Sequence, residues 1–163
     1  MGEAGPDSRG LLGGRLRERL PELRAAVTTR VHTFDDPGAV PDPAYREGLE
    51  AALPAAVEYA IDCLEAGDGR RPEVPVEVLA QARLDARDRV PLDTATRRYL
   101  AVNAILGDFL AEEAERAGVS SAALRRLLAV QATRLDEMLA AAGAEHAREV
   151  QNRPTTAAER RRE

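Results

Sequence analysis

Apolar side chains recur three and four residues apart along most of this chain, and prolines and glycines interrupt the pattern at short intervals. Leu23, Val27, Val31 and Phe34 form one such stripe, and further stripes follow as far as Val150. This spacing places the apolar side chains on one face of a helix, whereas a strand needs strict alternation, which no segment sustains. The sequence therefore predicts an all-α protein, a bundle of five to six helices.

The ends of the helices follow from residues that start or stop them. Pro21 suits the first turn of a new helix, or a kink at which the preceding helix continues. Pro54 lies inside a helical pattern and predicts a kink or a break. Asp93 is placed to cap the helix that ends at Ala117, and Gly118 suits the left-handed position after it. The other expected helices span 11–20, 22–34, 44–66, 76–88 and 121–151.

A chain of 163 residues is long enough for one domain with a real core. We expect a disordered N-terminus over residues 1–8, a helical sensory domain over 9–152, and a linker over 153–163 that leads toward an output domain. Cys63 lies beside Ile61 and Leu64, so we expect it to be a small buried side chain.

The charge balance and the missing motifs exclude several classes of function. The net charge is −5, and the 23 basic residues, all arginine, alternate with acidic ones, which argues against nucleic-acid binding by this segment. No apolar run approaches the roughly 20 residues of a membrane span, and residues 1–10 lack an apolar stretch of signal-peptide length. No catalytic motif, phosphate loop or zinc-ligand pair occurs. We expect a cytoplasmic, non-enzymatic domain without a cofactor or metal.

The segment from Leu84 to Leu110 carries a recognisable motif. A charged helix end runs into Val90-Pro91-Leu92, and the next helix carries Arg97 and Tyr99. This pattern resembles the helical N-terminal regulatory domain of bacterial PucR/CdaR-type transcription regulators, which is named after the RsbR-like co-antagonists of the stress response. The family usually has glycine where Arg89 stands and a second arginine where Leu100 stands. The resemblance implies a globin-like helical fold without haem and a signal-input role.

Three residues of the motif helix form the candidate ligand pocket. Tyr99 and Asn103 share one helix face, with Gly107 one turn further on, and Arg97 is the arginine of the motif. They are candidates for lining a small polar cavity that takes an unknown small-molecule effector. The alternative is a core tyrosine with a satisfied hydroxyl and a helix contact at Gly107.

The last long helix is the candidate for self-association. Its apolar face includes Leu135, Leu139, Ala142 and His146, and charged residues flank it. Such a face suits a partner helix, and we expect a homodimer. The alternative is that this face fills the core of its own domain. His146 and His32 are the histidines to test as haem ligands, although few aromatic residues are available to wall a haem pocket.

The sequence therefore predicts the N-terminal signal-sensing and dimerisation domain of a PucR-type transcription regulator. Two alternatives stay open. One is a stress-signalling scaffold domain of the RsbR type, and the other is a stand-alone helical protein that binds a small molecule or haem. The residues do not identify the ligand.

Overall fold

The structure, a computed structural model, describes residues 6–67 and 69–154. Its described residues form helices joined by short connections and contain no strand, which confirms the all-α prediction. The helices are α1 (Pro6–Glu18), α2 (Leu20–His32), α3 (Pro43–Ala66), α4 (Val76–Arg87), α5 (Leu92–Arg116) and α6 (Ser121–Gln151).

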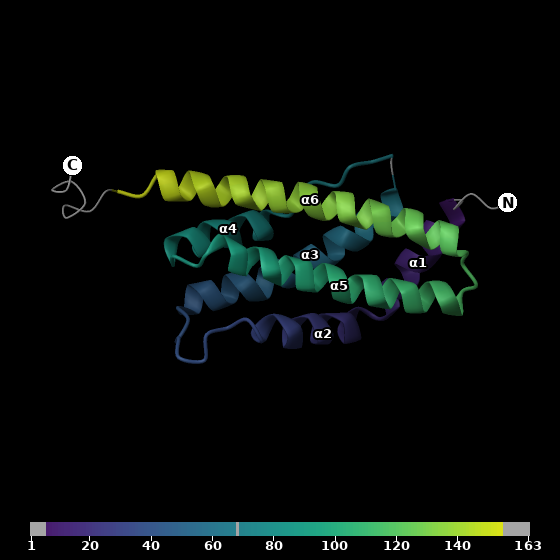
Figure 1. Cartoon of the computed structure of the whole chain (residues 1–163), viewed down its shortest axis with the longest axis horizontal. Coiled ribbons are helices and arrows are strands. Elements are labelled where there is room, and N and C mark those ends of the chain that lie inside the picture. Colours follow the sequence, from purple (N-terminus) through teal and green to yellow (C-terminus); the bar gives the residue numbers. More distant parts are fainter. Residues whose placement is uncertain (1–5, 68, 155–163) are drawn as a thin grey trace.

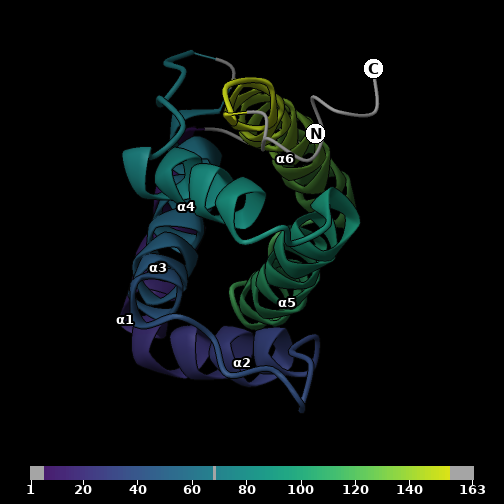
Figure 2. The same ribbon diagram turned by 90° about the vertical axis from the view of Figure 1, so that its left-hand side faces the viewer.

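The helices surround an elongated interior. Figure 1 shows α3, α5 and α6 running along the long axis of the molecule, with α2 beside α5. Helices α1 and α4 both pack on α3, toward opposite ends of the bundle, so that the end-on view shows a ring of helices (Figure 2). None of the described helices combines the length and apolarity that crossing a membrane requires.

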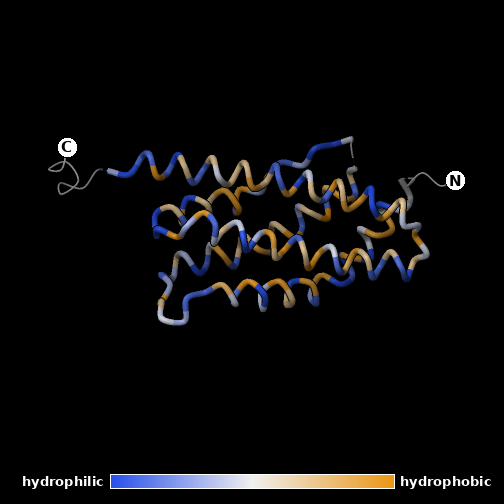
Figure 3. Tube along the Cα trace, in the orientation of Figure 1, coloured by the Kyte–Doolittle hydropathy of each residue, from blue (hydrophilic) through white to orange (hydrophobic). Residues whose placement is uncertain are grey.

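The interior holds two apolar clusters. The larger contains side chains from α1, α2, α3, α5 and the start of α6, and includes Leu23, Ile61 and Leu106. The smaller joins the second half of α3 to α4, α5 and the middle of α6, and includes Cys63 and Met138. Figure 3 shows hydrophobic and hydrophilic segments alternating along the helices, which is the pattern of amphipathic elements. The expected burial of Cys63 is confirmed.

The ends of the chain differ in part from expectation. Helix α1 begins at Pro6 and not at Leu11. Residues 6–8 of the expected disordered N-terminus therefore belong to this helix, whereas residues 1–5 lie outside the described part. The expected linker over 153–163 also lies outside it from residue 155 onward.

Both prolines with expected effects are inside helices. Pro21 stands in the first turn of α2, as predicted. Helix α3 continues from Pro43 to Ala66 through Pro54 without a break. Packing of α3 against α1, α4 and α6 outweighs the hydrogen bond that proline removes, because most helical stability in a bundle comes from the buried face.

The start of α5 corrects one prediction. The cap residue is Pro91, with no side-chain hydrogen bond, and its carbonyl oxygen accepts a bond from the Thr94 N–H at 3.0 Å. Asp93 lies inside the first turn, where its carboxylate pairs with Arg97 at 3.9 Å. Its negative charge suits the helix N-terminus, but it does not cap the helix.

The face that α6 turns inward coincides only in part with the expected apolar face. The predicted apolar stripe runs as far as Val150, but Val150 is 45 % exposed, and Leu128 near the start of the helix is 36 % exposed. Ala142 of the expected face is buried. The other buried residues of α6 recur at helical spacing beside that face, and two of them are polar: Ala123, Leu127, Gln131, Arg134 and Met138. A search for apolar residues misses such a stripe because Gln131 and Arg134 interrupt it.

Candidate functional site

The motif corner between α4 and α5 is closed by a left-handed residue. Arg89 has φ of 58°, and it is the one residue other than glycine with positive φ in the described part of the chain. The Val90 N–H donates to the Asp85 carbonyl at 2.8 Å, and the Arg89 N–H donates to the Ala86 carbonyl at 3.3 Å. These two bonds form a Schellman motif, in which this position is usually glycine. The arginine therefore occupies a conformation that costs about 1–2 kcal/mol.

The corner encloses a cluster of buried polar side chains, which we call the buried polar cluster: Tyr45, Gln81, Asp85 and Arg98. The Tyr45 hydroxyl donates to Asp85 Oδ1 at 2.8 Å, and Gln81 Nε2 donates to the same oxygen at 3.3 Å. Arg98 donates to the Tyr45 hydroxyl, and its guanidinium lies 3.6 Å from Asp85 Oδ1. The cluster thus ties α3, α4 and α5 together behind the Val-Pro-Leu turn.

Burial governs the protonation of this cluster. It raises the pKa of the Asp85 carboxyl above its ordinary value, against the hydrogen bond from Tyr45 and the charge of Arg98. Burial also raises the pKa of Tyr45 to about 12, so its hydroxyl keeps the proton that it donates. Arg98 Nε and Gln81 Oε1 are buried without a hydrogen-bond partner. Buried polar atoms without a hydrogen-bond partner destabilise a folded protein, so these two atoms reduce the net stabilisation that the cluster provides.

None of the four residues of this cluster is among the predicted site residues. Arg97 is the predicted arginine, but its side chain is 66 % exposed, whereas the side chain of the adjacent Arg98 is only 7 % exposed. A signal was present, because Val78, Ala82 and Asp85 follow helical spacing and so place a carboxylate on the buried face of α4.

Two of the three predicted pocket residues lie together. Tyr99 and Asn103 line a cavity of about 20 Å³ between α3, α5 and α6, with Gln131 and Met138 opposite. Gln131 Nε2 donates to the Asn103 carbonyl at 2.9 Å. Arg97 does not line this cavity. A space of this size accommodates about one water molecule and not an organic effector.

The four predicted association residues contact the rest of the domain. Ala142 is 6 % exposed, and Leu135 and Leu139 are half-buried against the smaller apolar cluster. His146 Nε2 lies 3.4 Å from the Val90 carbonyl, so this part of α6 packs on the motif corner. At these positions the apolar face of α6 therefore packs inside its own domain, which is the alternative to self-association.

The histidines occupy separate settings. His32, at the end of α2, is exposed, and its Nδ1 lies 2.7 Å from Asp35 Oδ2. His146, in α6, is half-buried. Within residues 6–67 and 69–154, no three His, Cys, Asp or Glu side chains are grouped so that they could hold a metal ion.

The fold and the motif corner define a small all-α domain. A family model described as the RsbT co-antagonist protein rsbRD N-terminal domain matches residues 17–162. Because the match spans most of the chain, the chain belongs to this family, a family of helical regulatory domains. No curated protein and no solved structure matches the chain.

Proposed function

We propose that this chain is the non-enzymatic signal-input domain of a PucR-type transcription regulator, acting in the cytoplasm. The observation that carries the proposal is the course of α6. This helix contributes Gln131 and Met138 to the small cavity and ends against the motif corner, where Glu145 pairs with Arg83 at 3.2 Å and Glu149 with Arg87 at 2.6 Å. A shift of α6 therefore moves both the interior and the chain that follows Gln151.

A signal acts on such a domain only if it favours one of two arrangements. The junction of α6 with α4 and α5 is the place where two arrangements would differ, because exposed or half-exposed ion pairs hold it and these exchange at little cost. The buried polar cluster would keep α3, α4 and α5 together while α6 moves.

Homodimer formation is part of the proposal. Since Leu135, Leu139 and Ala142 are used inside the domain, a second copy would bind the outward faces of α5 and α6. Leu100 and Leu128 are 48 % and 36 % exposed there. Light scattering at tens of micromolar is expected to give twice the monomer mass of 17.6 kDa; the monomer mass would refute dimerisation.

The family match also favours a second function, a stress-signalling scaffold domain of the RsbR type. The reading frame beyond Glu163 separates the two. A downstream region that ends in a helix-turn-helix supports the transcription regulator, and a STAS domain supports the scaffold. A stop codon directly after Glu163 contradicts both and leaves a free-standing carrier of a small molecule.

A further inference from the structure

A second and larger cavity lies where the start of α1, the connection after α3 and the first half of α6 meet. Its volume is about 430 Å³, within the range of small-molecule sites. Four arginines line it, namely Arg9, Arg71, Arg126 and Arg134, and Leu127 and Val130 supply apolar wall. The cavity therefore concentrates positive charge in a chain whose net charge is −5.

Two of the cavity arginines, Arg134 and Arg9, lie close to Gly67 in the connection after α3. Arg134 is 7 % exposed, and its Nη2 donates to the Gly67 carbonyl at 3.3 Å. Gly67 has φ of 60°, and a Cβ at this position would overlap the guanidinium of Arg9. The backbone conformation at Gly67 favours glycine, whereas the Arg9 guanidinium is the far end of a flexible side chain and could move aside for a Cβ. Guanidinium groups from α1 and α6 therefore both lie close to Gly67.

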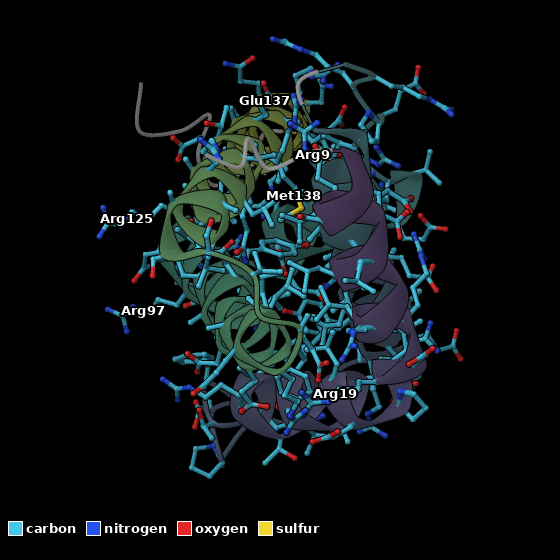
Figure 4. All side chains as sticks on the ribbon, turned by 90° about the vertical axis from the view of Figure 1, so that its right-hand side faces the viewer. Arg9, Arg19, Arg97, Arg125, Glu137 and Met138 are labelled. Atoms are coloured by element: carbon cyan, nitrogen blue, oxygen red, sulfur yellow. The ribbon has the colours of Figure 1, made fainter. Side chains whose placement is uncertain are left out.

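One carboxylate is shared between two of these arginines. Glu137 Oε2 accepts from Arg134 Nη1 at 2.9 Å, and Glu137 Oε1 lies 3.7 Å from Arg71 Nη1. In Figure 4, Arg9 is seen on α1 and Glu137 on α6, whereas Arg125 extends away from the bundle. Glu137 is thus an internal counter-ion that a bound anion would compete with for the same guanidinium groups.

Guanidinium groups bind phosphate and carboxylate oxygens through paired, charge-assisted hydrogen bonds. Four of them around one cavity match a ligand with more than one anionic group, and the apolar wall leaves room for a short carbon skeleton. We propose that this cavity binds a small polyvalent oxyanion, with at least two phosphoryl or carboxylate groups. This inference rests on the proposed function, because it names the chemical class of effector that the signal-input domain receives.

Isothermal titration calorimetry on the whole chain tests the proposal, with pyrophosphate and citrate as probes and acetate as the monovalent control. We expect pyrophosphate or citrate to bind at one site, more weakly as salt is added, and acetate to bind at least tenfold more weakly. Preference for pyrophosphate assigns phosphoryl groups, and preference for citrate assigns carboxylates. No binding of either probe at millimolar concentration, or equal binding of acetate, overturns the proposal.

Variants locate the site. The double substitution Arg71→Gln and Arg126→Gln removes two exposed cavity arginines and is expected to weaken binding at least tenfold, since each charge-assisted bond contributes strongly. The double substitution Arg97→Gln and Arg125→Gln is the matched control, because it removes the same two charges from exposed positions outside the cavity, and it should stay within twofold of wild type. Equal losses in the cavity variant and the control overturn the site.

Glu137→Gln should increase the affinity for the probe, whereas the arginine substitutions decrease it. Removing the internal counter-ion frees Arg71 and Arg134 for the ligand, so affinity for the preferred probe should rise severalfold. A fall in affinity contradicts the assignment of Glu137 as competitor. The outcome is independent of the reading frame beyond Glu163: binding without a downstream output domain overturns the proposed function alone, and an output domain without binding overturns this inference alone.

Discussion

Removal of the buried guanidinium of Arg98 is the perturbation whose cost the structure specifies best. Arg98→Met keeps most of the side-chain length but leaves the Asp85 carboxylate, which is 2 % exposed, without the positive charge 3.6 Å away. Breaking one half of a buried ion pair costs about 3–5 kcal/mol. Because Tyr45 and Gln81 still donate to Asp85, we expect the lower end, about 3 kcal/mol. That is a large share of the roughly 5–15 kcal/mol by which domains are stable.

The adjacent residue provides the control. Arg97→Met removes the same group from a side chain that is 66 % exposed and that pairs with Asp93 at 3.9 Å. Exposed pairs contribute about 0–1 kcal/mol, so this variant should stay close to wild type. Urea unfolding followed by helical circular dichroism measures both free energies of unfolding. Equal losses in the two variants would refute the reasoning.

The pH dependence tests the cause of the loss. Burial raises the pKa of Asp85, so the folded protein holds this proton more tightly than the unfolded chain does. The free energy of unfolding therefore rises as the pH falls from the folded-state pKa toward the unfolded-state value. Without Arg98 the folded-state pKa rises further, so Arg98→Met should lose less stability at about pH 5 than at about pH 7. Adding Asp85→Asn should restore part of the loss, and strict additivity of the two substitutions would argue against their coupling.

Three further predictions concern local structure and titration. Arg89→Gly should raise the free energy of unfolding by about 0.5–1 kcal/mol, because relief of the left-handed conformation exceeds the cost of the added backbone entropy. Gly118→Ala, at φ of 68° in open space, should lower the free energy of unfolding by about 1 kcal/mol. Urea unfolding measures both changes, and changes of the same sign would contradict the prediction. Ser120→Ala removes the hydrogen bond to the Ala123 N–H and should lower the melting temperature in a calorimetric scan, for a cost of about 1 kcal/mol. Burial raises the pKa of all three tyrosines, Tyr45, Tyr59 and Tyr99. Tyrosinate absorbance near 295 nm should therefore stay low in the folded protein at about pH 10.5 and appear when guanidinium unfolds it. Tyrosinate absorbance in the folded protein at that pH would contradict the burial of these side chains. The sign follows from linkage, since a raised tyrosine pKa means that stability falls as the pH rises above about 10.

Local signals in the sequence were enough for the helix ends. Gly118 adopts the left-handed conformation that its position after α5 predicts, and Ser120 caps α6 through its side chain. The strain at Arg89 was also predictable, because the family motif places glycine there. These features depend on residues within about one turn of each other, so a linear pattern contains the information. Asp93 shows the limit, since Pro91 begins the helix and leaves Asp93 inside the first turn.

The sequence by itself determined that this chain is a helical bundle, where most of its helices begin and end, and which family its motif corner belongs to. Only the tertiary structure decided that Arg98 and not Arg97 is buried, because its partner Tyr45 lies 53 residues earlier in the chain. The same holds for the arginine-lined cavity, whose wall joins α1, the connection after α3, and α6. Helical spacing shows which residues share a face, but polar residues face inward only where distant segments supply their hydrogen-bond partners.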